Sequence, residues 1–551
     1  MPITCSRLSF CWPDGTVVLD ELTASIGPGR TGLVAPNGAG KTTLLRLVAG
    51  LLTPTGGTVT VAGALGYLPQ TLPFDGRSRV CDVLGVTEKL AALDALAAGD
   101  VRDEVFAAIG EDWDIAEHTA AELDRLGLGG LAPDRPLAGL SGGEVVLLGL
   151  AGRLLARPDV LLLDEPSNNL DAAARRRLYR AVEEYRGTLL VASHDRDLLD
   201  RMDRIAELHR GRITWYGGNF TAYREAVRAA RAAAEAQVRA GRRELDLHRR
   251  QRQQARERAA RRAGAAARRL PAAGLPKIVA GAMKRRAQES AGRIDDVHEE
   301  RIAAARQRLR QAEARLRDDD AIVVDLPDTA VPAGRMLVRA RAVRYRIGDR
   351  ELFAGNGFDL DIGGPERIAL TGGNGAGKST LLRLLAGVLT PHAGEIRRVD
   401  GRIAYLSQRL DLLDERAGVA EQLAAAAPAM SPTRRRHLLA HFGFDDRRSG
   451  LPVSALSGGE RLRATLVCVL FAEPAPQLLL LDEPTNNLDL DSVAVLESAL
   501  TGYRGAFVVV SHDTRFLDAL RIDRRLVLAE GRLRDGELRA KEAHRPHPGT
   551  R

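Results

Sequence analysis

Two nearly identical stretches, APNGAGKTT at 35–43 and GGNGAGKST at 372–380, determine how this chain is interpreted. Each follows a short apolar run that is typical of a β-strand and precedes a run with the apolar spacing of a helix. Glycines allow backbone N–H groups to wrap around phosphate oxygens, and the following helix directs its positive end at the anion. A strand, a glycine-rich loop and a helix in this order predict a phosphate-binding loop, and the repetition predicts two such loops.

The residue types within each loop match the contacts that a nucleoside triphosphate needs. A lysine (Lys41 or Lys378) is expected to reach the β- and γ-phosphates, and the hydroxyl after it (Thr42 or Ser379) to bind Mg²⁺. The nucleotide-binding residues expected in the loops are Asn37, Gly38, Ala39, Gly40, Lys41, Thr42, Thr43, Gly372, Asn374, Gly375, Ala376, Gly377, Lys378, Ser379 and Thr380. Ala35 stands where the second loop has Gly372, so we expect the first loop to be slightly tighter.

Each loop has an acidic counterpart farther along the chain: VLLLDEPSNNLD at 160–171 and LLLLDEPTNNLD at 478–489. A continuous apolar run that ends in acids is typical of a central parallel strand, whose carboxyl end lies beside the loop. We expect Asp164 and Asp482 to hold Mg²⁺ through water, and Glu165 and Glu483 to polarise the attacking water. Two acids can also merely cap a strand, but the repetition of the whole pattern argues against that alternative.

Three shorter motifs also occur once in each half and in the same order. They are YLPQ and YLSQ with Gln70 and Gln408, LSGGE at 140–144 and 456–460, and SHD with His194 and His512. A Ser-Gly-Gly that opens a helix is another anion-binding helix terminus. A plain turn and a structural histidine are the alternatives, but the matched placement in both halves favours phosphate binding and a γ-phosphate sensor.

Composition and charge limit the class of protein. The chain has 551 residues, a formal net charge of +8 and 45% apolar residues, which suits a globular protein of several domains. Its four cysteines form no CxxC pair, so we expect free thiols in a reducing compartment. The first residues do not resemble a signal peptide, and no segment approaches the about 20 apolar residues that span a bilayer. We therefore expect a cytoplasmic protein.

The segment between the two halves differs from both in composition. Alanine, arginine and glutamate dominate it, and turn residues are nearly confined to LPAAGLP at 270–276. This composition favours helix, and two prolines favour a break, so we expect two long antiparallel helices. The expected organisation is a first nucleotide-binding domain at 1–217, a basic helical hairpin linker at 218–325, a second nucleotide-binding domain at 326–534 and a polar tail at 535–551.

Basic residues concentrate at the break in this linker. Lys277, Lys284, Arg285 and Arg286 lie there, and the preceding helix is rich in arginine. Such density is typical of an element that contacts RNA phosphates, so we expect these four residues to bind RNA. The alternative is a solvated helical spacer or a disordered linker. A spacer needs no charge at its break, which favours RNA contact.

The order of the motifs resembles the ATP-binding-cassette superfamily, in which a P-loop, YLxQ, LSGGE, LLLDEP and SHD follow one another. The resemblance implies an α/β fold with two P-loop cassette domains joined by the long α-helical hairpin. It implies that the two cassettes pair head to tail within one monomeric chain. Each ATP then lies between the P-loop of one cassette and the SGG helix of the other, where it is hydrolysed to ADP and phosphate.

The resemblance also distributes the residues between two composite sites. The first site would join Lys41, Thr42, Gln70, Asp164, Glu165 and His194 to Ser457 and Gly459. The second site would join Lys378, Ser379, Gln408, Asp482, Glu483 and His512 to Ser141 and Gly143. The implied Mg²⁺ ligands are Thr42, Gln70, Asp164, Ser379, Gln408 and Asp482. An aromatic side chain near the start of each cassette would stack on adenine, with Tyr345 in the second and Phe10 or Trp12 in the first.

Two fused cassettes, a basic helical linker and its entry sequence GGNFTAY at 217–223 resemble the ABC-F family of ribosome-associated ATPases. The resemblance implies that the linker enters the ribosome and contacts ribosomal RNA or tRNA. Some members of that family are translation factors, and others dislodge antibiotics. The compact insertion between Gln70 and Leu140 and the short tail favour the antibiotic-resistance type. The alternative is the ATPase subunit of a transporter with separate membrane proteins.

Overall fold

The computed structural model describes residues 3–72, 77–168, 170–269, 297–313, 326–348, 350–353, 355–399, 402–408, 411–486 and 488–536. The chain forms two compact units, Met1–Phe220 with Ala321–Arg551, and Thr221–Asp320. The four basic residues expected to bind RNA (Lys277, Lys284, Arg285 and Arg286) lie outside the described residues, as does most of the expected polar tail.

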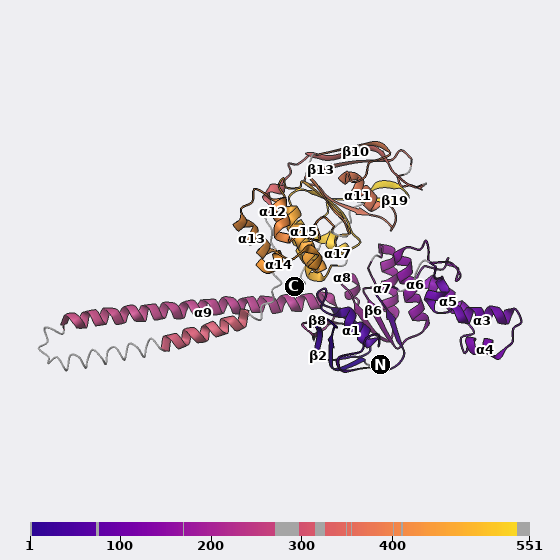
Figure 1. Ribbon diagram of the computed structural model, residues 1–551, viewed down its shortest axis with the longest axis horizontal. Coiled ribbons are helices and arrows are strands. Elements are labelled where there is room, and N and C mark those ends of the chain that lie inside the picture. The colour runs from indigo at the N-terminus through magenta and orange to yellow at the C-terminus, as the bar shows by residue number, and fades with distance from the viewer. Residues whose placement is uncertain are drawn as a thin grey trace, which may run out of the picture. The chain divides into compact units, whose positions relative to one another are not determined.

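The first unit contains two cassettes, each built on a largely parallel six-stranded sheet (Figure 1). In the first cassette the strand order is β5 (Leu65–Leu68), β6 (Val160–Asp164), β7 (Thr188–Ala192), β3 (Gly29–Val34), β8 (Arg204–His209) and β9 (Arg212–Gly217). In the second it is β16 (Ile403–Leu406), β17 (Leu478–Asp482), β18 (Ala506–Val510), β14 (Arg367–Thr371), β19 (Arg524–Ala529) and β20 (Arg532–Gly536). Every residue of β6, β7, β17 and β18 is buried, which explains their uninterrupted apolar sequences.

Each cassette also has an antiparallel sheet. The first contains β2 (Val17–Ile26), β1 (Ile3–Cys11) and β4 (Gly56–Val61), and the second contains β13 (Phe358–Gly363), β10 (Met336–Arg344) and β15 (Ala393–Arg398). A short hairpin of β11 (Arg346–Ile347) and β12 (Arg350–Glu351) follows β10. The apolar faces of these sheets pack on the helix that follows each P-loop, α1 (Lys41–Val48) or α11 (Lys378–Ala386).

The helices between the P-loop and the acidic strand distinguish the two cassettes. The first cassette has α2 (Val80–Leu84), α3 (Thr87–Ala97), α4 (Asp103–Ile109), α5 (Ile115–Arg125) and α6 (Gly142–Leu155). The second has α12 (Val419–Ala426), α13 (Pro432–His441), α14 (Asp446–Ser449) and α15 (Gly458–Leu470). Helices α7 (Ala172–Glu184) and α8 (Arg196–Leu199) complete the first cassette, and α16 (Leu490–Gly502) and α17 (Thr514–Ala519) complete the second.

Polar side chains start the helices that the repeated motifs open. Ser141 and Ser457 accept from the backbone N–H of Glu144 and Glu460, whose carboxylates accept from the serine N–H in return. This reciprocal pairing is a capping box, and it gives the last residue of LSGGE a structural role. Asp171 and Asp489, at the ends of the acidic motifs, cap α7 and α16 by accepting from backbone N–H groups of the first turn, without the reciprocal bond.

Charged side chains also connect the two cassettes to each other. Arg196 Nη1 lies 2.6 Å from Glu497 Oε1, with both side chains largely buried. Arg515 pairs with Asp197 at 2.8 Å and also with Asp200. These contacts place the residues just after the two SHD motifs at the interface.

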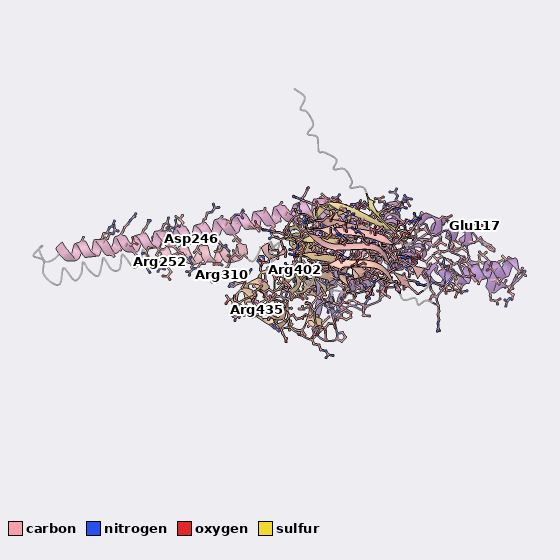
Figure 2. All side chains as sticks on the ribbon, turned by 90° about the horizontal axis from the view of Figure 1, so that it is seen from above. Glu117, Asp246, Arg252, Arg310, Arg402 and Arg435 are labelled. Carbon is pink, nitrogen blue, oxygen red and sulfur yellow. The ribbon has the colours of Figure 1, made fainter. Side chains whose placement is uncertain are left out.

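The second unit is a pair of helices, as predicted (Figure 2). Helix α9 (Phe220–Arg269) has 50 residues, about 75 Å at the rise of an α-helix. Leu245 packs against Ile302 and Ala305 of the helical segment 297–313. Three ion pairs, Arg242–Glu313, Glu244–Arg308 and Arg252–Glu299, join the helices in antiparallel order. No helix among the described residues is long and apolar enough to cross a membrane.

Candidate nucleotide sites between the cassettes

Both P-loops have the strand, loop and helix context that the sequence predicts. The last glycine of each loop, Gly40 or Gly377, caps the following helix with a φ of 100° or 102°, a left-handed conformation that favours glycine. A Cβ on Gly372 would lie 2.3 Å from the carbonyl oxygen of Leu528. Ala35 occupies the corresponding place in the first loop and is buried. The two loops therefore cannot follow the same path at this position.

The two P-loop lysines are buried and turn into their own loops. Lys41 Nζ donates to the carbonyl of Ala35 at 3.0 Å and lies 2.7 Å from His194 Nε2. Lys378 Nζ donates to the carbonyls of Gly372 and Gly373 at 2.8 and 3.1 Å, and lies 3.4 Å from His512 Nε2. Burial lowers the pKa of both lysines. Carbonyls are poor substitutes for phosphate oxygens as partners of an ammonium, so each lysine is suited to release them for an anion.

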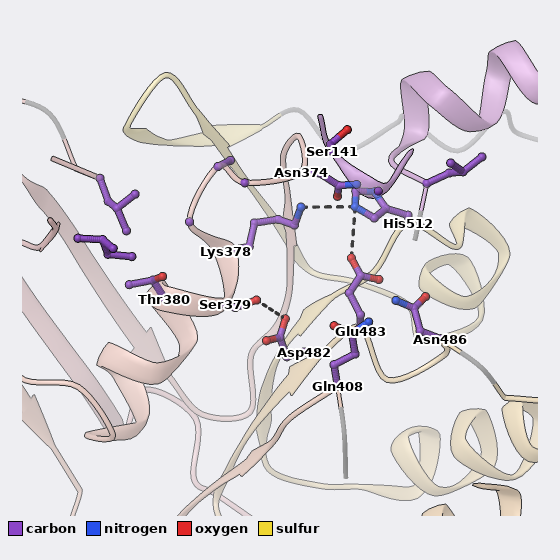
Figure 3. Close-up of a pocket in the computed structure, with 17 residues that line it drawn as sticks. Ser141, Asn374, Lys378, Ser379, Thr380, Gln408, Asp482, Glu483, Asn486 and His512 are labelled. Carbon is purple, nitrogen blue, oxygen red and sulfur yellow. Dashed lines mark hydrogen bonds and ion pairs between the residues drawn. The ribbon is translucent and has the colours of Figure 1, made fainter. Parts of the chain in front are cut away.

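A hydroxyl and an aspartate meet beside each lysine. Thr42 Oγ1 donates to Asp164 at 3.2 Å, and Ser379 Oγ donates to Asp482 at 3.1 Å (Figure 3). The other carboxylate oxygen accepts from a tyrosine of the preceding strand, Tyr67 at 3.4 Å or Tyr405 at 3.1 Å. These tyrosines belong to the YLPQ and YLSQ motifs, but the sequence interpretation assigned a role only to the glutamines.

The paired glutamate and histidine of each site also face each other. Glu165 Oε1 lies 3.4 Å from His194 Nε2, and Glu483 Oε1 lies 3.2 Å from His512 Nε2 (Figure 3). Both glutamates have positive φ angles, 48° and 47°, which is strained for a residue with a side chain. Each strained residue follows a buried strand whose last residue is the metal-binding candidate Asp164 or Asp482. The main chain therefore directs two successive acids into one small space.

Burial changes the protonation of these pairs. It raises the pKa of Glu165 to about 8 and that of Glu483 to about 7, while the adjacent lysine charge works against the shift. Burial also lowers the pKa of His512 to about 4 and that of His194 well below its usual value, and in both cases the lysine charge adds to the effect. The imidazoles are therefore neutral near pH 7, and the glutamates titrate in the physiological range.

A cavity of about 510 Å³ lies at the second P-loop and includes residues of both cassettes. Its lining contains Asn374, Gly375, Ala376, Gly377, Lys378, Ser379, Thr380, Gln408, Asp482, Glu483, Asn486 and His512 of the second cassette and Ser141, Gly142 and Leu170 of the first. The start of α6 therefore faces the second P-loop across the cavity. Gly143 follows in the first turn of α6 and is buried.

The first P-loop meets the second cassette through Asp489. The backbone N–H of Asn37 donates to Asp489 Oδ2 at 2.9 Å. A Cβ on Gly459, in the first turn of α15, would lie 2.3 Å from Ser492 Oγ and 3.8 Å from Asp489 Oδ1. The helix capped by Ser457 is thus tightly packed on Ser492 and lies beside Asp489, which reaches the first P-loop. Asp171 lies at the corresponding place beside Gly373, 4.0 Å from the Cβ that a side chain would add there. The sequence interpretation gave neither aspartate a role at the sites.

The aromatic residues proposed to stack on adenine are differently placed. Phe10 is only 6% exposed, packs in the core and meets Trp12 edge to face, so it has no free face for a base. We therefore exclude Phe10 and retain Trp12, which is partly exposed. In the second cassette Tyr345 packs against His392 and is absent from the cavity lining, to which Ile347 contributes.

Two observations indicate that the residues of these sites are suited to bind a nucleotide and a divalent cation. Among the described residues, Glu165 Oε1, Glu483 Oε2 and His194 Nδ1 are buried and lack a hydrogen-bond partner. Buried polar atoms are normally satisfied, so these atoms suit a ligand or its water. The oxygen donors Thr42 with Asp164 and Ser379 with Asp482 are the type that Mg²⁺ prefers. Gln408 lines the cavity, and Gln70 is exposed two residues after the end of β5.

Comparison with known proteins agrees with this architecture. The family model described as ABC transporter matches residues 19–168 and 356–486. The chain is 36% identical to the tylosin resistance ATP-binding protein TlrC of Streptomyces fradiae, over 91% of this chain and 93% of the relative. It is 32% identical to the energy-dependent translational throttle protein EttA of Mycobacterium tuberculosis H37Rv, over 91% of this chain and 87% of the relative. It is also 32% identical to the probable ATP-binding protein YheS of Escherichia coli K12, over 93% and 76%.

Among solved structures, the archaeal ribosome recycling factor aABCE1, in complex with the stalk protein aP1, matches with a TM-score of 0.57. The match covers 95% of this chain and 87% of that chain at 21% identity, so it supports the tandem-cassette fold alone. The matched P-loops, the acidic strands and the relatives that share nearly the whole chain support one conclusion: this protein is a tandem-cassette ATPase that belongs to the ABC-F family.

Proposed function

We propose that this protein acts on the ribosome as a cytoplasmic ATPase that protects translation from an antibiotic. The observation that carries the proposal is the 36% identity, over nearly the full length of both chains, to a protein named for tylosin resistance. A role as a translation factor is the second candidate, because EttA is 32% identical and is named as a translational throttle. Both candidates require contact with ribosomal RNA, or with tRNA bound to it.

Helix α9 supplies the surface for such contact. Between residues 249 and 262 it carries seven arginines and one acid. Arg249, Arg250, Arg258, Arg261 and Arg262 are exposed, whereas Arg252 pairs with Glu299 of the opposite helix. Arginine charges on one helix attract the phosphates of RNA and displace counterions, which makes binding strongly dependent on salt. We extend this proposed RNA contact to Lys277, Lys284, Arg285 and Arg286.

ATP hydrolysis is proposed to use the same groups in both sites. The P-loop N–H groups and the lysine hold the phosphates, and the SGG helix of the opposite cassette closes on them. Thr42 with Asp164, and Ser379 with Asp482, would hold Mg²⁺, aided by Gln70 and Gln408; the ion would neutralise phosphate charge. The deprotonated glutamate orients and polarises the attacking water, and the neutral histidine senses the γ-phosphate.

Sedimentation of ribosomes tests the ribosomal role. The E165Q/E483Q variant should remain bound to ATP and sediment with ribosomes, and added salt should weaken the association. Replacing Arg249, Arg250, Arg258 and Arg261 with alanine should weaken it further while leaving basal ATPase activity intact. The matched control replaces four exposed cassette arginines, Arg176, Arg180, Arg434 and Arg436, and changes net charge equally. Equal loss in both variants would show that only net charge matters, and sedimentation with membranes would favour a transporter subunit.

Drug sensitivity distinguishes resistance from a factor role. Expression in a susceptible bacterium should raise the inhibitory concentration of a ribosome-targeting drug, and tylosin is the first to test. The α9 alanine variant should lose this effect and the cassette control should keep it. Ribosome binding without protection against any drug of this class would support the translation-factor role instead.

A further inference from the structure

Arg175 belongs to the first cassette, but its side chain reaches the second site. It lies in the first turn of α7, four residues after the capping Asp171. Its Nη1 donates to the main-chain carbonyl of His512 at 3.4 Å and lies 3.9 Å from Asp195 Oδ2. The side chain is 15% exposed, and its Nε has no hydrogen-bond partner in the described part of the chain. The guanidinium thus extends across the interface to the loop that carries His512.

Helix stability does not account for an arginine here, and pairing within the first cassette accounts for only part of its environment. A cation in the first turn faces the positive end of the helix dipole, which is unfavourable. Burial removes hydration from the guanidinium, yet the pKa of Arg175 stays above its usual value because negative charges of both cassettes surround it, Asp195 of the first and Asp513 and Glu483 of the second. Its hydrogen bond to the main chain of the second cassette lies at the base of the His512 loop.

The position of His512 matters because one ring nitrogen lies close to two groups that are proposed to act on ATP and on the attacking water. His512 Nε2 is 3.2 Å from Glu483 Oε1 and 3.4 Å from Lys378 Nζ. A hydrogen bond to the carbonyl of His512 restrains the main chain from which this ring projects. Loss of that restraint would let the ring move relative to Glu483 without removing any group that contacts ATP.

At the first site, a valine stands at the position that corresponds to Arg175. The residue four positions after the capping Asp489 is Val493, which is buried in the core of the second cassette. Both sites do share the capping aspartate beside the opposite P-loop. Arg175 is therefore an addition to the second site, and it breaks the symmetry of the pair.

We propose that Arg175 is a positioning residue for hydrolysis at the second site, acting from the opposite cassette on the main chain of His512. The proposal rests on the roles proposed above for Glu483 and His512. This contact gives the second site an additional dependence on docking of the two cassettes. The guanidinium of Arg175 reaches the second site only when the first cassette is docked, and the first site receives no such group from the matching position. Hydrolysis at the second site should then respond to interface changes that leave ATP bound.

Single-turnover phosphate formation in two backgrounds tests this. The E165Q background retains Glu483, so it reports hydrolysis at the second site. The E483Q background retains Glu165, so it reports hydrolysis at the first site. R175A should slow phosphate formation about tenfold or more in the E165Q background, and clearly less in the E483Q background. The KM for ATP should change less than about twofold, since the lost group acts on the chemical step. R175K should recover part of the rate because it retains a donor and a charge.

R176A is the matched control, because Arg176 is the exposed neighbour on the same helix. It should leave the rate of phosphate formation unchanged in both backgrounds. Equal slowing by R175A in both backgrounds, or no slowing in either, would overturn the proposal. Thermal unfolding of each variant distinguishes loss of the fold from misplacement of the His512 loop. If R175A unfolds, R175Q serves as a second variant, because it retains most of the side-chain volume. The E165Q/E483Q protein tests the glutamate roles separately: fast turnover in it would contradict those roles whatever Arg175 does.

Discussion

The two nucleotide sites are built from the same motifs, yet their surroundings differ. The first P-loop has a buried Ala35 where the second has Gly372, and Lys41 approaches its histidine more closely than Lys378 does. Arg175 reaches the second site, while Val493 occupies the matching position of the opposite cassette. Burial raises the pKa of Glu165 further than that of Glu483. A repeated sequence thus fixes the chemical groups, but the docking of two unequal halves sets their environment.

The largest expected effect tests what the two sites share. Replacing Glu165 and Glu483 together with glutamine removes the carboxylates that we propose to polarise water and keeps their size. Hydrolysis should fall by about 10²–10³-fold or more, while ATP binding is retained. Steady-state phosphate release and binding of a fluorescent ATP analogue measure the two effects. Near-normal turnover of the purified double variant would show that these glutamates do not assist the reaction in either site.

The interface between the cassettes provides the next comparison. Arg196 and Glu497 form a largely buried ion pair, whereas Thr514, the counterpart of Arg196, makes one hydrogen bond to Asp197. Removing Arg196 leaves the largely buried carboxylate of Glu497 without this partner, so R196A should lower the free energy of unfolding by about 3 kcal/mol. T514A, the matched control, should cost less than about 1 kcal/mol. Chemical denaturation measures the free energy of unfolding of both variants. Equal losses in R196A and T514A would show that the buried ion pair does not stabilise the protein more than the hydrogen bond of Thr514.

The lysines test whether both P-loops bind nucleotide. Each lysine is expected to contribute charge-assisted hydrogen bonds worth about 1.5–3 kcal/mol, so replacing either with alanine should weaken ATP binding about 10- to 100-fold at its own site. The K41A/K378A variant should lose binding at both sites. Titration with a fluorescent ATP analogue reports each affinity. Unchanged affinity in the double variant would contradict the P-loop assignment.

The smallest effect separates the two glutamates by pH. A glutamate polarises water only when it is deprotonated, so the rate at each site should rise as pH passes through the pKa of that residue. Burial raises the pKa of Glu165 to about 8 and that of Glu483 to about 7, so the first site should reach half its maximum at the higher pH. Single-turnover rates of E483Q and E165Q across pH 6–9 measure the two profiles. Coincident profiles, or the reverse order, would contradict the inferred difference.

The sequence predicted the local parts of the sites because local patterns determine them. The glycines, lysine and hydroxyl of each P-loop lie within one short segment, and the acids end a strand whose apolar run is visible in the sequence. Their meeting follows from the parallel sheet, which brings the ends of β3, β6 and β7 to one edge. The helical hairpin was also predictable, since composition alone favours helix over such a length.

Two parts of the site could not be predicted in this way. Strand β1 changes register on both sides of Phe10, so counting alternate residues could not show that this ring points into the core. Arg175 and His512 are separated by 337 residues and meet only when the cassettes dock. The same holds for Asp489 and Asn37, which belong to different halves of the chain. Contacts that depend on docking leave no pattern in a single sequence.

The central claim is that each site takes its P-loop from one cassette and its SGG helix from the other. Blocking one SGG helix with arginine in a background that leaves a single active glutamate tests it directly. With E165Q, which leaves the second site active, S141R should abolish single-turnover hydrolysis and S457R should have much less effect. With E483Q the order should reverse. If each serine variant instead inactivates the site of its own cassette, the head-to-tail arrangement is contradicted.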